Sequence, residues 1–200
     1  ENPQDLAFDT TLESGVRIGN GNDLREHVTI HRSTSEEGWT SIGNDNFLMT
    51  GSHLGHDVTI GNQNVIANNC LLGGHVLVEN NTFLGGGAAF HQFIHVGELS
   101  MTHGNSPISK DIPPYCIVSQ RNRLVGLNFV GLRRAGMDPE TRTEIKRAYR
   151  AAFRSQLPLA ETLVKMRQEQ WGPSARHFLQ ALANPSRKGV CFPKPGREAS

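Results

Sequence analysis

The sequence has little of what a membrane-spanning, secreted or disulfide-stabilised protein needs. It contains no run of 18 or more apolar residues, so a transmembrane helix is not expected. No charged segment followed by an apolar one opens the chain, so no signal peptide is recognised. The three cysteines, Cys70, Cys116 and Cys191, cannot all pair and lack the spacing of a metal site. We therefore expect a cytoplasmic protein with free thiols.

Familiar catalytic motifs are missing as well. Gly85-Gly86-Gly87 is not followed by Lys and Ser or Thr and does not open a helix, so it is not a phosphate-binding loop of the usual kind. No serine or cysteine lies in a nucleophile elbow. Any chemistry must therefore come from other residue types.

Acidic residues are scarce in one part of the chain and basic residues in the other. Residues 1–120 carry 4 Lys/Arg against 13 Asp/Glu, whereas residues 121–200 carry 16 against 6, and the whole chain has a net charge of only +1. The basic part favours an acidic partner: nucleic acid, anionic lipid or an acidic protein. Attraction between the two parts, or between neighbouring subunits, is an equal alternative.

A six-residue repeat organises the first half. Steps of six from Ile18 to Val96 give 14 positions, of which all but Glu36 are apolar, and glycine follows seven of them. About five apolar positions would be expected by chance from the overall apolar content of 36%. The repeat predicts a mainly β protein, a left-handed parallel β-helix of hexapeptides in which three hexapeptides form one triangular coil.

Three regions are expected along the chain. The β-helix should span residues 1–115, with a loop excursion at 31–41, where Glu36 interrupts the repeat. Residues 116–136 should form an irregular basic connection. A small α-helical domain should span residues 137–200.

Capping residues mark the helices of the last region. Asp138 is a suitable N-cap and Pro139 a suitable first residue for one helix. A second helix is expected over residues 159–171 and a third from Pro173. Residues 184–200 should form a frayed tail.

Histidines are the candidate catalytic residues. Eight of the nine lie between His27 and His103, inside the predicted β-helix. His56, His75 and His91 are about one coil apart, so their side chains should stack on one side of it. Imidazole is suited to general-base catalysis at neutral pH, and acyl transfer to a hydroxyl group needs such a base.

Neighbouring groups support this hypothesis, and two alternatives stay open. Asp57 could orient His56, and backbone N–H groups at Gly73 and Gly74 could stabilise an oxyanion. In one alternative, three histidines bind zinc across a subunit boundary, as in a trimeric carbonic anhydrase, although the spacing argues against it. In the other, the histidines are exposed surface residues without a role in catalysis.

Several longer stretches are more specific than the repeat. They are Gln4-Asp5-Leu6, residues 25–32, residues 45–49, His53-Leu54-Gly55-His56-Asp57, Ala67-Asn68-Asn69, Gly74-His75-Val76, His91-Gln92-Phe93, residues 111–115 and residues 126–134. In this combination the sequence resembles the UDP-N-acetylglucosamine O-acyltransferases, which open lipid A biosynthesis in Gram-negative bacteria. The resemblance covers nearly the whole chain.

The resemblance implies a catalytic set. His56 would be the general base that deprotonates the 3-hydroxyl of the glucosamine unit, which then attacks the thioester of an acyl-acyl carrier protein. Asp57 would orient His56, and the N–H of Gly74 would donate to the oxyanion. No cofactor and no metal are implied, because the acyl carrier protein brings the acyl group as a co-substrate.

The resemblance also implies binding residues and an assembly. Gly104 matches the position that limits acyl length, and glycine there implies a medium or long chain, with or without a 3-hydroxyl group. The site would lie between subunits of a homotrimer. The implied substrate-binding residues are Asp5, His31, His53, His75, His91, Gln92, Asn128 and Arg134.

Acyl carrier protein is acidic, which gives the basic second part a candidate partner. A solvated helix face is the alternative interpretation. The candidate contacts lie at helical spacing: Arg142, Lys146, Arg147, Arg150 and Arg154.

Two departures from the family pattern keep other functions open. Ala7 stands where the family usually has Lys, and Val130 stands where it often has Glu. One alternative is an N-acyltransferase that acts on a related UDP-amino sugar. Another is a non-catalytic subunit that binds a UDP-sugar or carrier protein.

Overall fold

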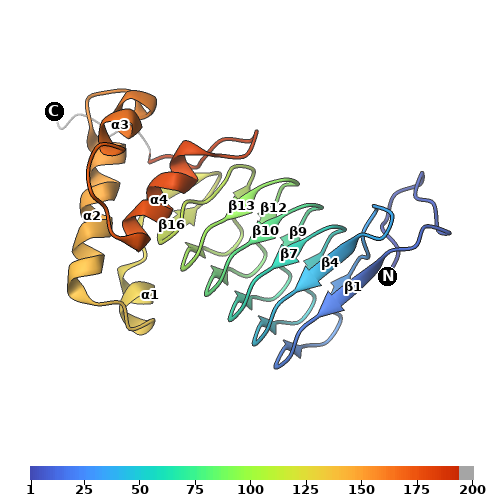
Figure 1. Ribbon diagram of the computed structural model, residues 1–200. Coiled ribbons are helices and arrows are strands. Elements are labelled where there is room, and N and C mark those ends of the chain that lie inside the picture. Colours follow the sequence, from blue (N-terminus) through green and yellow to red (C-terminus); the bar gives the residue numbers. More distant parts are fainter. Residues whose placement is uncertain (194–200) are drawn as a thin grey trace.

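The computed structural model describes residues 1–193, which form a β-helix followed by a group of helices (Figure 1). Its strands make three sheets, the faces of a prism, and they pair in parallel except for one antiparallel pair at the end of the second sheet. The first face holds β1 (Gly15–Ile18), β4 (Trp39–Ile42), β7 (Thr59–Ile60), β10 (Leu77–Val78) and β13 (His95–Val96). The second face holds β2 (Asp23–Leu24), β5 (Phe47–Leu48), β8 (Val65–Ile66), β11 (Phe83–Leu84), β14 (Met101–Thr102), β16 (Cys116–Ser119) and β17 (Arg123–Leu127). The third face holds β3 (Thr29–Ile30), β6 (His53–Leu54), β9 (Leu71–Leu72), β12 (Ala89–Phe90) and β15 (Pro107–Ile108).

The chain visits the three faces in turn, one hexapeptide per face. Leu54 pairs with Leu72 on the third face, so one coil contains 18 residues. The predicted left-handed parallel β-helix of hexapeptide repeats, with a helical part after it, is confirmed.

The repeat aliphatics fill the prism. Leu48, Leu54, Ile66 and Leu72 have no exposed surface, and burial of such side chains contributes roughly 1.5–3 kcal/mol each. Cys70 is also fully buried and is a free thiol, as its place in the repeat predicts.

Corners need unusual backbone conformations. At most corners, the residue three positions before the inward aliphatic adopts a positive φ, as at Asp57 (60°), His75 (58°) and Phe93 (66°). The glycine after the aliphatic has a different role: a Cβ on Gly55 would lie 2.8 Å from the backbone nitrogen of Gly74 in the next coil. Coils therefore approach most closely at glycine and turn at the residue with positive φ.

The excursion loop is shorter than the predicted range 31–41. It occupies residues 31–38, because Trp39 already pairs with Gly15 and starts β4. Glu36 is exposed on the loop rather than directed into the prism.

The region 116–136 is regular, contrary to the prediction. β16 continues the second face, and β17 folds back on it as an antiparallel hairpin. Gln120 and Asn122 turn the hairpin with φ values of 52° and 57°. The helix α1 (Phe129–Arg134) follows. No six-residue pattern marks these elements, since the hairpin pairs antiparallel rather than coil by coil.

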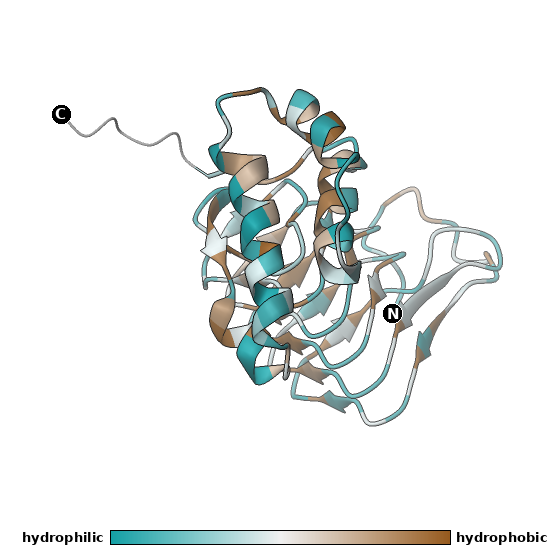
Figure 2. Ribbon diagram, turned by 60° about the vertical axis from the view of Figure 1, so that its left-hand side comes forward, coloured by the Kyte–Doolittle hydropathy of each residue, from teal (hydrophilic) through white to brown (hydrophobic). Residues whose placement is uncertain are grey.

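Three further helices pack beyond the β-helix: α2 (Pro139–Arg154), α3 (Leu159–Met166) and α4 (Pro173–Ala183). Asp138 caps α2 as predicted and accepts a hydrogen bond from the N–H of Thr141 at 2.8 Å. α3 ends before the predicted residue 171, because the indole of Trp171 turns back to donate to the carbonyl of Met166. Along α2, hydrophilic residues alternate with the apolar ones that it buries (Figure 2).

The segment after α4 is ordered where a frayed tail was expected. Ser186 donates from its backbone N–H and its hydroxyl to the carboxylate of Asp111, and Val190 forms a bridge with the same residue. Residues 194–200 of the predicted helical domain and tail lie outside the described residues. Over residues 1–193, no helix has both the length and the apolar character to cross a membrane.

Candidate active site

One edge of the prism, between the third and first faces, collects the candidate residues. Successive coils place Gly55-His56-Asp57, Gly73-Gly74-His75 and His91-Gln92-Phe93 at this edge, 18 residues apart. The excursion loop at 31–38 leaves the prism at the same edge, one coil earlier. The repeat thus stacks side chains that are distant in sequence, and the loop adds groups to them.

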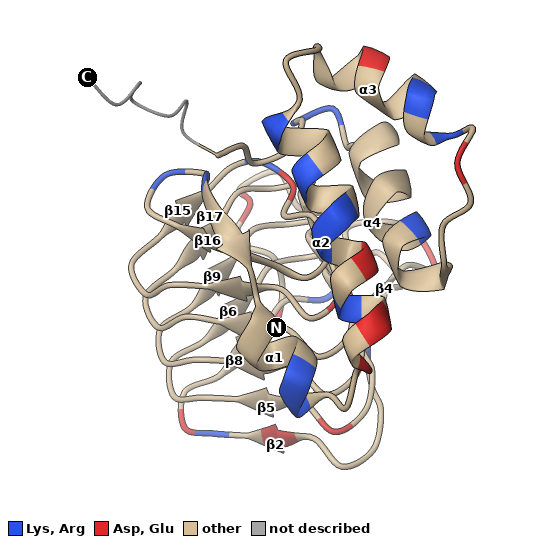
Figure 3. Ribbon diagram, turned by 90° about the vertical axis from the view of Figure 1, so that its left-hand side faces the viewer, with Lys and Arg blue, Asp and Glu red and all other residues tan. Residues whose placement is uncertain are grey.

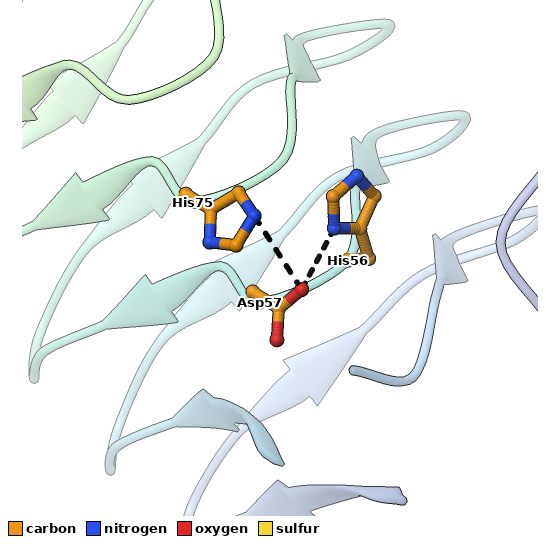
Figure 4. Close-up of side chains that lie close together, drawn as sticks. All are labelled: His56, Asp57 and His75. Carbon is orange, nitrogen blue, oxygen red and sulfur yellow. Dashed lines mark hydrogen bonds and ion pairs between the residues drawn. The ribbon is translucent and has the colours of Figure 1, made fainter. Parts of the chain in front are cut away.

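His56 and Asp57 form a hydrogen-bonded pair. The Nδ1 atom of His56 lies 2.8 Å from Oδ2 of Asp57, and both side chains are largely buried (Figure 4). A carboxylate on Nδ1 fixes the tautomer in which Nδ1 carries the proton and Nε2 has a free lone pair. His56 is therefore oriented as a general base through Nε2.

The excursion loop holds Asp57 in place. The hydroxyls of Ser33 and Thr34 donate to its two carboxylate oxygens, and the N–H of Thr34 lies 3.2 Å from Oδ2. Burial alone would raise the pKa of Asp57, but the hydrogen bonds from Ser33, His56 and Thr34 outweigh it and lower the pKa to about 2. Asp57 is thus an anion at neutral pH.

Gly74 lies against the opposite side of the His56 ring. A Cβ built on Gly74 would stand 2.5 Å from Nε2 of His56, so any larger residue here would displace this ring. Among residues 1–193, no backbone acceptor is found for the N–H of Gly74. The base and a free backbone donor are therefore adjacent, as an oxyanion-forming reaction requires.

His75 completes the cluster from the next coil. Its Nε2 lies 3.7 Å from Oδ2 of Asp57, and its ring meets the ring of His56 edge-on at 5.0 Å (Figure 4). Phe93 stacks on its other side at 4.5 Å and 8°, beneath the guanidinium of Arg187. Burial lowers the pKa of His75, although Asp57 opposes this effect. Burial therefore favours the neutral imidazole.

His31 and His53 form a second pair on the previous coils. Their rings meet edge-on at 4.6 Å, and Nδ1 of His53 lies 2.8 Å from the hydroxyl of Thr29. Burial lowers the pKa of both imidazoles. Both are therefore suited to contact a ligand as neutral hydrogen-bonding groups.

A groove of about 590 Å³ runs past His31, His53 and His56, whereas Asp57 and His75 are not among its lining residues. The N-terminal residues Pro3 to Leu6 line it opposite the third face. The predicted site residues that line it are Asp5, His31, His53, His56, Gly74 and Gln92.

Four other predicted residues do not line this groove in the single chain. Asn128 is buried, where it caps α1 and donates to the carbonyl of Leu99. Arg134 is exposed at the end of α1. His91 is exposed at the edge, with Nδ1 3.2 Å from its neighbour's carbonyl. Gly104 lies at a different edge, where a Cβ would be 2.9 Å from the carbonyl oxygen of Gly86. Within one chain, these residues are not among those that line the groove.

The basic candidates form a stripe along α2 (Figure 3). Lys146 lies over the ring of Phe129 at 5.9 Å, and Arg147 lies over Trp171 at 4.1 Å. Arg142 is half-buried, whereas the other four predicted contacts, Lys146, Arg147, Arg150 and Arg154, are exposed. An acidic partner could reach them.

Sequence reasoning missed four residues of this site. Ser33 and Thr34 were recognised only as part of a loop, and Phe93 only as part of a motif. Arg187 was assigned to a frayed tail. The one available signal was the position of the loop, since an excursion from a repeat often serves a site at the edge where it leaves.

The fold and its repeats first define the class of protein. The family model for bacterial transferase hexapeptides (six repeats) matches residues 40–74, so this is a hexapeptide-repeat transferase fold. The family model described as UDP N-acetylglucosamine O-acyltransferase, domain 2, matches residues 111–191.

Individual relatives then specify the family. An acyl-(acyl-carrier-protein)–UDP-N-acetylglucosamine O-acyltransferase of Synechocystis sp. is 39% identical over 198 residues, which is 98% of this chain and 71% of the relative. The structure of the Arabidopsis UDP-N-acetylglucosamine acyltransferase matches with a TM-score of 0.90 and 38% identity, over 95% of this chain and 70% of that one. The Francisella novicida enzyme matches with a TM-score of 0.89 and 32% identity, over 98% and 72%. The chain belongs to the UDP-N-acetylglucosamine O-acyltransferase family of enzymes.

Proposed function

We propose that this protein transfers a medium or long acyl group, with or without a 3-hydroxyl, from acyl carrier protein to the 3-hydroxyl of UDP-N-acetylglucosamine. This would be an early step of lipid A biosynthesis, carried out in the cytoplasm. The observation that carries the proposal is the pair of His56 and Asp57, with Nδ1 and Oδ2 2.8 Å apart, beside the backbone of Gly74. Family membership gives the substrates, and this pair gives the chemistry.

The proposed reaction needs one base and one oxyanion donor. Nε2 of His56 takes the proton of the sugar 3-hydroxyl, and the oxygen attacks the thioester carbonyl carbon. The N–H of Gly74 donates to the oxyanion that forms. The C–S bond then breaks, the leaving thiolate of the carrier protein takes the proton from protonated His56, and the ester is released. No further cofactor enters this scheme, because the thioester supplies the driving force.

The groove would hold the sugar nucleotide. Asp5, His53 and Gln92 line it near His56 and offer hydrogen-bonding groups to a sugar. His31 and His75 flank them on the neighbouring coils. His91 lies at the rim, beside Gln92.

A homotrimer with sites between subunits would bring in the remaining residues. Asn128 and Arg134 do not line the groove of their own chain, so a neighbouring copy would have to supply them. The outer side of the second face offers an interface, because it presents an unbroken apolar row. The row consists of Phe47, Val65, Phe83, Met101 and Ile117, paired in register and exposed or half-buried. Such a row on a single chain is typical of a surface that another subunit covers.

Acyl carrier protein would dock at the basic stripe on α2. Arg150 and Arg154 are exposed there and would pair with its acidic side chains. The end of a long acyl chain would pass Gly104, which carries no side chain, at the edge between the second and third faces.

The test is product analysis by mass spectrometry, with UDP-N-acetylglucosamine and a series of acyl carrier proteins of different acyl length and hydroxylation. We expect a mono-acylated product whose acyl group is released by mild base, as an ester is. A base-stable product would indicate an amide and favour the N-acyltransferase. Binding of the UDP-sugar without any turnover would favour the non-catalytic subunit.

A further inference from the structure

We propose that His56, Asp57 and His75 form a zinc-binding site within one chain, and that Zn²⁺ bound there blocks catalysis. The binding rests on geometry alone. The block also rests on the proposed role of His56 as the general base.

The three donor atoms are already close together. One ligand atom from each residue can be chosen so that all three lie within 4.8 Å of one another. Oδ2 of Asp57 is 2.8 Å from Nδ1 of His56 and 3.7 Å from Nε2 of His75, and both imidazoles face the carboxylate (Figure 4). Tetrahedral zinc with ligands at about 2.0–2.1 Å separates its donors by about 3.4 Å. The observed distances lie on either side of this value, so side-chain shifts of less than about 1 Å would complete the site.

The surroundings hold these donors in place. Thr34 donates to Asp57 from its hydroxyl at 2.7 Å, and Ser33 donates to the other carboxylate oxygen. Phe93 stacks on His75 and limits its rotation. Partners of this kind around a metal site orient the ligands and strengthen binding.

The donor set selects zinc over the hard cations. Two imidazoles and one carboxylate suit Zn²⁺, whereas Ca²⁺ and Mg²⁺ prefer all-oxygen sites. The His56 and His75 side chains are 24% and 36% exposed, so an ion can enter and a water molecule can occupy the fourth position.

Zinc bound to Nδ1 of His56 would prevent this residue from acting as the general base. In the paired state Nδ1 of His56 carries the ring proton and Nε2 is free. When Zn²⁺ binds Nδ1, the ring proton moves to Nε2, so that the ring stays neutral and Nε2 can no longer accept a proton. Asp57 at the same time loses its role as acceptor from His56.

A second histidine–carboxylate group in the molecule provides the matched control. His95 and His177 both approach Oε1 of Glu79, at 2.9 and 3.2 Å, between the β-helix and α4. Among residues 1–193 this trio does not meet the distance condition that the first trio meets. His95→Gln therefore removes an imidazole beside a carboxylate without touching the proposed site.

The experiment is calorimetric titration of the full chain with Zn²⁺, with Co²⁺ as a spectroscopic probe of coordination. We expect one Zn²⁺ per chain and the visible absorption of tetrahedral Co²⁺. His75→Asn should weaken Zn²⁺ binding at least tenfold, since Asn tolerates the positive φ of this position but supplies no imidazole. His95→Gln should leave binding unchanged. A circular dichroism spectrum checks the fold, and His56→Gln serves as the second variant.

The outcomes separate this proposal from the proposed function. The zinc site is overturned if no saturable binding occurs, or if neither His75→Asn nor His56→Gln weakens it. The block is overturned if a Zn²⁺-saturated enzyme still transfers acyl groups at the metal-free rate. Zinc binding that is lost in His75→Asn, in a protein without acyltransferase activity, supports the site and counts only against the proposed function.

Discussion

The backbone of Gly74 lies so close to the ring of His56 that a Cβ there would be 2.5 Å from Nε2. The α-carbon of the residue that carries the oxyanion donor is therefore packed against the base. Gly74→Ala would push the imidazole, a movable side chain, rather than backbone. We expect kcat to fall about 100-fold through misplacement of the base, with a change in unfolding free energy below about 1 kcal/mol.

Gly126→Ala is the control for this substitution, because a Cβ at Gly126 meets nothing within 4 Å. Steady-state kinetics and chemical denaturation of both variants make the comparison. Equal activities of the two variants would contradict the proximity argument.

Asp57→Asn tests the orientation of the base. Asn tolerates the φ of 60° at this position, so the coil should keep its shape. The amide cannot fix His56 in the same tautomer or stabilise its protonated form, and we expect kcat to fall by about 10²–10⁴. Asp45→Asn makes the same change at an exposed corner with a φ of 56° and should leave kcat unchanged. Similar rates for both variants would remove Asp57 from the mechanism.

Stability should depend on pH through the contact between the β-helix and α4. Glu79 accepts from His177 and faces His95, and Glu98 and Tyr115 approach His177 from the β-helix. Burial would raise the pKa of Glu79, but its hydrogen bonds to His177 and His95 lower it well below its ordinary value. The hydrogen bond to Glu79 raises the pKa of His177.

The two shifts define a window. Because the pKa of Glu79 is lowered in the folded protein, its ionised carboxylate stabilises the fold above the ordinary pKa of 4.5. This stabilisation is lost as the pH falls. Because the pKa of His177 is raised in the folded protein, its protonated imidazole stabilises the fold below the ordinary pKa of 6.5. This stabilisation is lost as the pH rises. Glu79→Gln should therefore cost about 1 kcal/mol near pH 5.5, after allowance for solvent screening, and less at pH 8.5. Chemical denaturation at both pH values measures the loss of unfolding free energy in Glu79→Gln. An equal loss at both would contradict the pairing of Glu79 with His177. Glu36→Gln, on the exposed loop, is the control.

A buried polar ladder holds the coils together. Asn64 is fully buried, and its Oδ1 atom accepts hydrogen bonds from the backbone N–H and the hydroxyl of Thr82. The backbone N–H of Asn64 in turn donates to Oδ1 of Asn46. Asn64→Ala would leave the Thr82 donors unpaired in the prism and should cost about 2–3 kcal/mol. Asn62→Ala removes the same kind of bond, to Asn44, at a half-exposed corner where water replaces it, and should cost about 1 kcal/mol or less. Equal losses in thermal stability would contradict the role of burial.

The residues that could be predicted are those that the repeat fixes. Leu48 and Leu72 had to point inward, and Asp57 and His75 had to occupy the same corner of successive coils, because six-residue periodicity determines both the face and the coil. Ser33 and Thr34 reach Asp57 across 23 or 24 positions of chain, from a loop whose path no periodicity describes. Arg187 reaches Phe93 only because Asp111 anchors the segment after α4, a tertiary contact without a local signal. The hairpin of β16 and β17 was missed for a similar reason, since antiparallel pairing ends the hexapeptide pattern.

The acyl-transfer assay of His56→Ala beside the native chain and His27→Asn tests the central claim most directly. His27 is an exposed corner histidine with a φ of 60°, on another edge, so its loss controls for removal of an imidazole. We predict a base-labile acyl-UDP-sugar from the native chain and from His27→Asn, and a loss of at least about 10³-fold in His56→Ala. Product formation by His56→Ala at the native rate would contradict the assignment of the base, and with it the mechanism.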